Sequence, residues 1–98
     1  MTIEIKKNAT ETIIEIVGRL DTITAPALDK TINEDMGEVK NLVLDLTDME
    51  YISSAGLRVL LGAQKKMQNI GSMKVTGVCE EVMEVFEMTG FADILVIE

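Results

Sequence analysis

The feature that most constrains the fold is a regular alternation of two apolar patterns along the chain. Short runs rich in Ile, Leu and Val, which are typical of β-strands, are separated by longer segments whose apolar residues recur every three or four positions, as on one face of an α-helix. Strands that alternate with helices favour a mainly parallel sheet with right-handed crossover connections. The chain is therefore predicted to belong to the α/β class.

Eight elements are predicted, in the order ββαβαβαβ, with short turns and no linker or internal repeat. The first two strands form a hairpin, which adds an antiparallel edge to the sheet. With 98 residues, of which 47% are apolar, the chain suits a single domain over residues 1–98. We predict strands at residues 2–6, 11–17, 42–46, 73–76 and 94–97, and helices at residues 24–36, 53–70 and 80–89, with Thr24 capping the first helix and Gly37, Gly71 and Gly90 ending the three.

The net charge of the chain makes some classes of binding partner less favourable than others. Nine basic and 17 acidic side chains give a net charge of −8, which disfavours binding to nucleic acid or to an anionic membrane. The N-terminus alternates polar and apolar residues instead of forming the apolar run of a signal peptide, and no stretch has the length of a transmembrane helix. Cys79 is the single cysteine. We therefore expect a soluble, cytoplasmic protein without an internal disulfide.

In such a sheet, ligands and partners meet the loops that follow the carboxyl ends of the parallel strands. The most informative segment runs from Asp45 to Arg58 and leads from the central strand through a polar turn into Ser53 and Ser54, which open the long helix. Two interpretations of the serines remain open. A hydroxyl here could simply cap the helix, or it could carry a phosphoryl group, because a helix N-terminus stabilises negative charge.

The segment from Asp45 to Leu57 resembles the signature of STAS domains, specifically of the stand-alone bacterial anti-sigma factor antagonists (anti-anti-sigma factors). That pattern is roughly Asp-Leu-Ser/Thr-x-hydrophobic-x-Tyr/Phe-Ile/Met-Asp/Ser-Ser-x-Gly-Leu. The stretch from Gly18 to Asp21 is similar to the Gly-x-Leu-Asp that ends the family's second strand, and Val82, Phe86 and Gly90 are similar to its final helix and turn. The resemblance covers essentially the whole chain and implies a STAS-like fold.

The resemblance also implies a partner-switching function. The unmodified protein would bind an anti-sigma factor that is also a serine kinase using ATP and magnesium, and would thereby release a sigma factor. Phosphorylation by this kinase would end the binding, and a PP2C-type phosphatase would restore it. On the family pattern the acceptor is Ser54. Ser53 is the alternative acceptor, since it stands where many members have Asp, whereas Ala55 replaces a hydroxyl residue of many members.

The same resemblance places Asp21 near the acceptor, where it would help to shape the contact surface. For Tyr51 and Leu57, a place in the core is an equally open interpretation. The predicted partner-binding surface consists of Asp21, Thr22, Tyr51, Ser53, Ser54, Leu57 and Arg58.

Other functions have weaker support in the sequence. The chain has no histidine, which removes the Ser–His and Cys–His pairs of many enzymes, and it has no glycine-rich phosphate loop. Asp45, Asp48 and Glu50 do not form an evident magnesium site, since acidic side chains are common in exposed turns. We therefore predict a non-enzymatic protein without a cofactor or metal. A sensory or scaffolding STAS module that binds a small molecule or a nucleotide remains the alternative.

Overall fold

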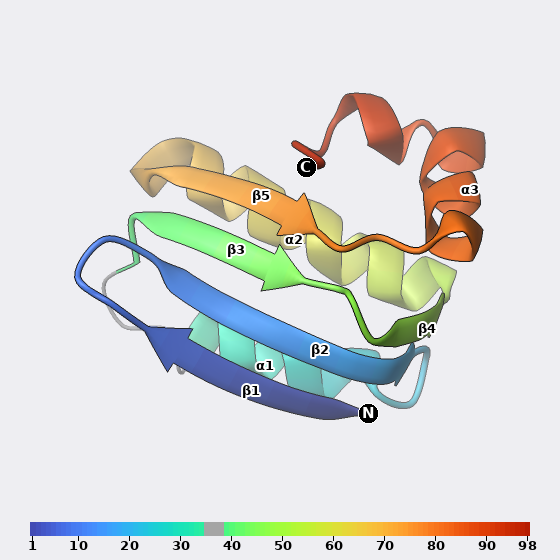
Figure 1. Cartoon of the computed structure of the whole chain (residues 1–98), viewed down its shortest axis with the longest axis horizontal. Coiled ribbons are helices and arrows are strands. Elements are labelled where there is room, and N and C mark those ends of the chain that lie inside the picture. Colours follow the sequence, from blue (N-terminus) through green and yellow to red (C-terminus); the bar gives the residue numbers. More distant parts are fainter. Residues whose placement is uncertain (35–38) are drawn as a thin grey trace.

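The computed structural model describes residues 1–34 and 39–98 (Figure 1). The predicted end of the first helix, at Met36 and Gly37, lies outside the described residues. The elements are β1 (Thr2–Lys7), β2 (Thr12–Leu20), α1 (Ala25–Glu34), β3 (Asn41–Asp45), β4 (Met49–Ile52), α2 (Ser54–Ile70), β5 (Ser72–Thr76), α3 (Glu80–Thr89) and the short 3-10 helix η1 (Phe91–Asp93).

One mixed sheet organises the chain. Its strands lie in the order β1-β2-β3-β5, and the short β4 pairs with the carboxyl end of β2. Only the β1–β2 pair is antiparallel among the described strands, while β2–β3, β2–β4 and β3–β5 are parallel. This arrangement confirms the predicted mainly parallel α/β fold with an antiparallel edge.

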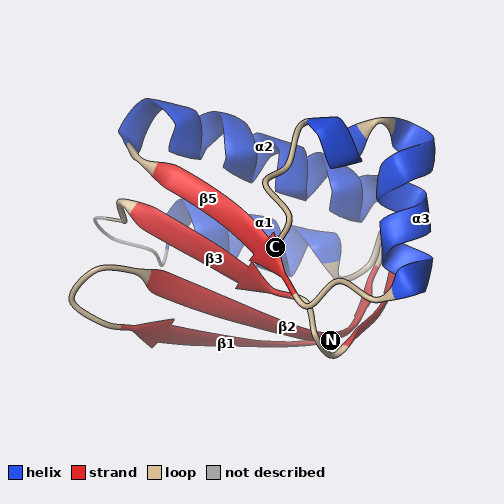
Figure 2. Cartoon of the chain, turned by 45° about the horizontal axis from the view of Figure 1, so that its top comes forward, coloured by secondary structure: helices blue, strands red, loops and turns tan. Residues whose placement is uncertain are grey.

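Helices α1 and α2 pack side by side on one face of the sheet, and the opposite face carries neither of them (Figures 1 and 2). Helix α3 stands at one end of the sheet, where it contacts β4. Within the described residues no helix has both the length and the apolar character needed to cross a membrane.

The core lies between the sheet and the two packed helices. Alternate residues of the central strands face it, and each helix contributes residues spaced three or four apart, as the apolar pattern predicts. Full burial of such a side chain contributes about 1.5–3 kcal/mol, so this layer holds the sheet and helices in place. The side chains that are almost fully buried include Ile14, Ile16, Leu20, Leu28, Leu42, Leu44, Leu60, Val75, Val82 and Phe86.

The sequence does not predict strand β4, because it indicates a polar turn in this region. Met49 and Ile52 are buried at its two ends, while Glu50 and Tyr51 between them are exposed. Pairing with β2 is irregular, because the register shifts between Gly18 and Arg19. The strand matters for the site, since it leads directly into α2.

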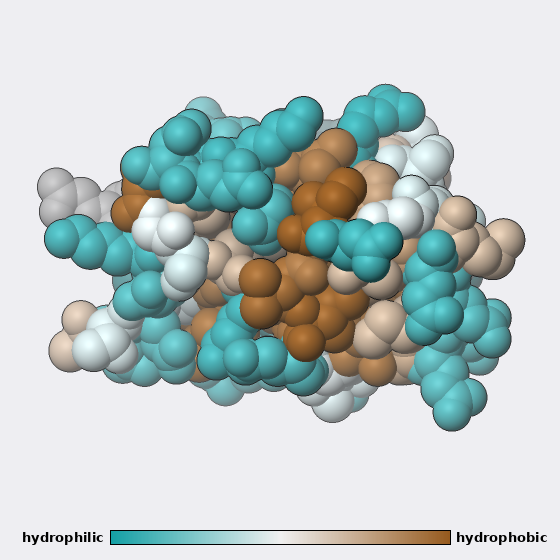
Figure 3. All heavy atoms as spheres, turned by 90° about the horizontal axis from the view of Figure 1, so that it is seen from above, coloured by the Kyte–Doolittle hydropathy of each residue, from teal (hydrophilic) through white to brown (hydrophobic). Residues whose placement is uncertain are grey.

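The predicted closing strand at residues 94–97 is also different in the structure. It is reduced to one parallel bridge between Val75 and Ile97, in which the Val75 N–H donates to the Val96 carbonyl at 2.8 Å and the Glu98 N–H donates to the Val75 carbonyl at 2.9 Å. Because η1 intervenes after α3, only the last few residues reach the edge of β5. Ile94 and Val96 of this segment are exposed apolar residues. Figure 3 shows one face of the molecule, on which apolar side chains lie between hydrophilic ones.

Candidate functional site

The ends of β2 and β4 bring together two loops that are far apart in the sequence. Leu20 and Ile52 are register partners at the carboxyl ends of these parallel strands. The Ser53 N–H then donates a hydrogen bond to the Leu20 carbonyl at 2.9 Å. The loop that begins at Asp21 and the start of α2 therefore lie at the same edge of the sheet.

The two serines have different positions in the helix. Ser53 is the N-cap of α2, and its hydroxyl oxygen accepts a hydrogen bond from the Gly56 N–H at 3.4 Å. Ser54 is the first helical residue, and it is exposed. The capping interpretation thus applies to Ser53, whereas the Ser54 hydroxyl lies on the surface beside the unpaired N–H groups expected at a helix start.

Gly56 determines how closely the first turn of α2 approaches the sheet. A Cβ atom at this position would lie 2.8 Å from Cγ of Leu20 and 2.9 Å from Cγ1 of Ile52. Both distances are shorter than carbon atoms tolerate, so only glycine allows this contact. The glycine of the motif therefore fixes where the neighbouring Ser54 stands relative to the β2 end.

Asp21 organises the loop between β2 and α1. Its Oδ1 accepts hydrogen bonds from the backbone N–H groups of Ile23 at 3.0 Å and Thr24 at 3.1 Å. The Thr24 hydroxyl, which was predicted to cap the first helix, donates instead to the Arg19 carbonyl at 2.8 Å. The hydrogen bond from the Thr24 N–H is the main reason that the pKa of Asp21 lies below its usual value. Asp21 is thus a structural residue of the loop as well as part of its surface.

Tyr51 and Leu57 have opposite surroundings. The Tyr51 side chain is 42% exposed, and the guanidinium of Arg19 stacks on its ring at 4.3 Å from the centroid. Nε of Arg19 also lies 3.8 Å from Oδ2 of Asp21, which links the ring to the loop. Leu57 is only 6% exposed and packs in the core, so its predicted place on the partner-binding surface is wrong.

Asp45, which opens the motif, builds the turn between β3 and β4. Its Oδ1 accepts hydrogen bonds from the Thr47 N–H at 3.0 Å and from the Thr47 hydroxyl at 2.6 Å. The hydroxyl hydrogen bond is the main cause of its lowered pKa. In the part of the chain that the structure describes, no three Cys, Asp or Glu side chains gather as ligands for a metal ion. Asp45, the acidic residue that opens the motif, therefore serves the backbone geometry of this turn.

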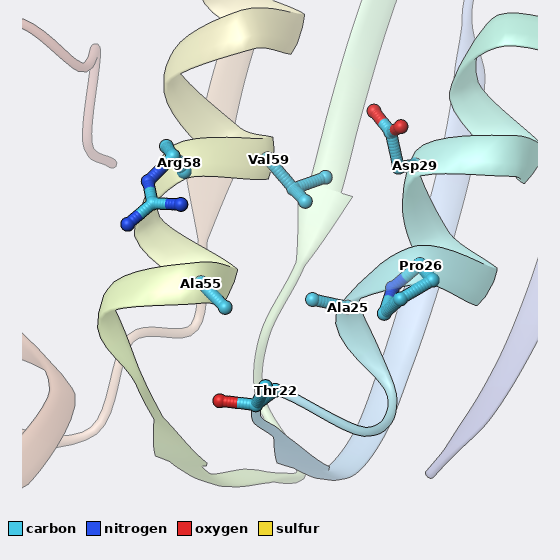
Figure 4. A pocket seen from close by; sticks show the side chains of 7 residues that line it. All are labelled: Thr22, Ala25, Pro26, Asp29, Ala55, Arg58 and Val59. Atoms are coloured by element: carbon cyan, nitrogen blue, oxygen red, sulfur yellow. The ribbon is translucent and has the colours of Figure 1, made fainter.

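A groove of about 350 Å³ lies between the first turns of α1 and α2, next to the two loops (Figure 4). The sequence predicted two of its residues, Thr22 and Arg58, as part of the surface, but not the groove itself. The signal available in the sequence is that Ala55 and Val59 are four residues apart, and so lie on one side of α2. The groove is lined by Thr22, Ala25, Pro26, Asp29, Ala55, Arg58 and Val59.

The residues around this edge form one surface, which we call the docking rim. Four of them are exposed, Thr22, Tyr51, Ser54 and Arg58, and two are half-buried, Asp21 and Ser53. Its members come from the β2–α1 loop, from β4, from the N-cap Ser53 and from the first two turns of α2. Of the residues predicted to bind a partner, Leu57 alone is left out.

Comparison with known proteins gives consistent matches. The STAS domain family model matches residues 2–98. The chain is 34% identical to the anti-sigma-B factor antagonist of Listeria monocytogenes over 103 residues, which covers 100% of this chain and 89% of that protein.

Two solved structures illustrate the likeness of fold. An anti-sigma factor antagonist from Mycobacterium paratuberculosis has a TM-score of 0.88 at 23% identity, over 98% of this chain and 83% of that one. The Bacillus cell fate determinant SpoIIAA in its phosphorylated form has a TM-score of 0.76 at 15% identity, over 99% and 91% of the two chains. The chain therefore belongs to the STAS domain family, among the anti-sigma factor antagonists, which are regulatory proteins and not enzymes.

Proposed function

We propose that this chain is an antagonist that binds an anti-sigma factor with serine kinase activity through the docking rim, and that phosphorylation of Ser54 ends the binding. The observation that carries the proposal is the exposed Ser54 at the first position of α2, beside a capping Ser53. A kinase can reach this hydroxyl without any change in the core. The bound sigma factor would be released when the antagonist occupies its anti-sigma factor.

The phosphoryl group would act by charge and bulk at the centre of the docking rim. It adds about −1.5 to −2 charges at neutral pH, and a partner that covers it must remove those charges from water. Weakening a complex about a thousandfold requires only ~4 kcal/mol. Neither Ser53 nor Gly56 would need to move, because Ser54 is exposed and takes no part in the contacts of those two residues.

The fold itself supports this kind of switch. SpoIIAA, which has the same fold, exists in a phosphorylated form. In the present chain, the first turn of α2 offers N–H groups and the helix dipole to a phosphate. Removal of the group by a phosphatase of the PP2C type completes the proposed cycle and needs the same exposure of Ser54.

The experiment is phosphate transfer from the cognate anti-sigma kinase. The purified chain is incubated with the kinase and Mg-ATP, and the modified residue is mapped by mass spectrometry. We expect one phosphate on Ser54, lost in Ser54→Ala and retained in Ser53→Ala. Modification of Ser53 alone, or of neither residue, would refute the assignment. Tight nucleotide binding by the chain alone, without a protein partner, would favour the sensory module instead.

A further inference from the structure

Arg58 lies one helical turn after Ser54 and is exposed. Its side chain has no hydrogen bond or ion pair with any of the described residues. In Figure 4 its guanidinium points back toward the first turn of α2, on the side of the helix away from Val59. An unpaired cation is thus available next to the proposed acceptor.

The helical spacing brings the two side chains within reach. Residues four apart on a helix have Cβ atoms about 5–6 Å from each other, and long side chains lean toward the N-terminus. Arg58 therefore leans over the turn that begins at Ser54. A guanidinium donates two parallel N–H groups to phosphate oxygens, which suits it to this partner better than an ammonium group.

Other charged groups nearby are less suited than Arg58 to bind a phosphoryl group at Ser54. Arg19, at the end of β2, is already held by the Tyr51 ring and by Asp21. Asp21 in the loop, Asp29 across the groove on α1 and Glu50 on β4 are acidic. Among these charged groups of the described residues, Arg58 is thus the cation without a partner that a phosphoryl group at Ser54 would meet.

We propose that Arg58 folds onto the phosphoryl group of Ser54 and holds it against the first turn of α2. The inference deepens the proposed function and rests on it for its biological role. Arg58 is also the only cation among the seven residues that line the groove. The modification therefore does two things at once: it adds a negative group to the docking rim, and it neutralises the positive group that borders the groove.

The test uses the full chain with phosphoserine placed at position 54 through an expanded genetic code. It needs no kinase, so its outcome is separate from that of the proposed function. The second pKa of the phosphate is measured by ³¹P NMR in this protein and in its Arg58→Gln, Arg19→Gln and Lys65→Gln variants. Lys65 is the matched control, since it is exposed on α2 about three turns from Ser54.

We expect Arg58→Gln to raise the phosphate pKa by about 0.3 pH unit or more, because the guanidinium would no longer stabilise the doubly charged phosphate. Lys65→Gln should change it much less. Equal values in the parent and in Arg58→Gln would overturn the proposal. So would a shift that Arg19→Gln removes and Arg58→Gln leaves intact.

A second measurement follows the arginine itself. The Nε–H signal of Arg58 should move with the same midpoint as the phosphate titration, and the movement should weaken in about 1 M salt, where the Debye length is about 3 Å. An Arg58 signal that does not respond to the ionisation of the phosphate would contradict the proposed contact.

Discussion

Gly56 illustrates how a single residue positions the site. Its missing side chain lets the first turn of α2 rest against Leu20 and Ile52. Gly62, also inside α2, has no atom within 4 Å of where a Cβ would stand, and it is exposed. The two helical glycines therefore differ in what a methyl group would meet, although both weaken the helix in the same way.

Substitution of these glycines by alanine should have opposite effects on stability. Gly56→Ala should lower the free energy of unfolding by about 1–3 kcal/mol, since overpacking outweighs the better helix propensity. Gly62→Ala should raise it by about 0.5–1 kcal/mol. Chemical denaturation of both variants measures the difference. A Gly56→Ala protein as stable as Gly62→Ala would show that the close contact is not restrictive.

The stabilising contribution of the Asp21 carboxylate should depend on pH. Its folded pKa is lowered, chiefly by the hydrogen bond from the Thr24 N–H, so the carboxylate stabilises the fold above the unfolded pKa of about 3.9. That contribution is lost as the pH falls through the lower, folded pKa. The stability difference between the parent and Asp21→Asn should therefore be largest near pH 7 and shrink by about pH 2.5. Urea denaturation at both pH values tests this, and a difference independent of pH would contradict it.

At the scale of elements, the hydroxyl groups of Ser53 and Ser54 at the start of α2 have different structural roles. Ser53 satisfies a helix-end N–H, and Ser54 is exposed with no hydrogen bond from its side chain to the described residues. The sequence predicted a cap and a phosphoacceptor within this pair, but it could not assign the cap, since adjacent serines have the same local preference.

Alanine substitutions at Ser53 and Ser54 should show which of the two side chains stabilises the fold. Ser53→Ala should lower the free energy of unfolding by about 1 kcal/mol, because the Gly56 N–H loses its acceptor. Ser54→Ala should change it by less than about 0.5 kcal/mol, as is usual for an exposed position. Thermal or chemical denaturation measures both. Equal losses in the two variants would show that Ser54 also supports the helix.

Strand β4 is a part of the site that could not be predicted from the sequence. Its inward residues, Met49 and Ile52, enclose two exposed ones, so the period-two alternation that reveals a strand is absent. The longer strands and helices carried clear periodicity and were predicted within a few residues. At residues 94–97 the sequence predicts a strand that the structure does not have, since four consecutive apolar residues are typical of a strand. Because η1 precedes this segment, it forms only one bridge with β5.

At the scale of the whole molecule, the C-terminal segment completes the core without being a regular strand. Leu95 is 5% exposed and belongs to the core, whereas the neighbouring Ile94 is 45% exposed. The fold can therefore be summarised as a sheet with two helices on one face, closed at the β5 edge by one short segment.

This arrangement predicts unequal costs for two neighbouring truncations. Leu95→Ala should lower the free energy of unfolding by about 2–4 kcal/mol through the lost burial and the cavity that remains. Ile94→Ala should cost less than about 1 kcal/mol, since half of that side chain already faces water. Equilibrium denaturation compares them. Similar losses in both would mean that the segment is not anchored through Leu95.

The central claim concerns the whole molecule and its partner: a phosphoryl group on an intact fold stops recognition. The most direct test is the affinity of the cognate anti-sigma kinase, by calorimetry, for the unmodified chain and for the chain with phosphoserine at position 54. A chain with phosphoserine at position 69 instead, in place of the exposed Asn69 at the other end of α2, is the control. We predict a loss of about a hundredfold or more at position 54, roughly 3 kcal/mol, and little change at position 69. Equal affinity of the unmodified and Ser54-phosphorylated chains would contradict the account.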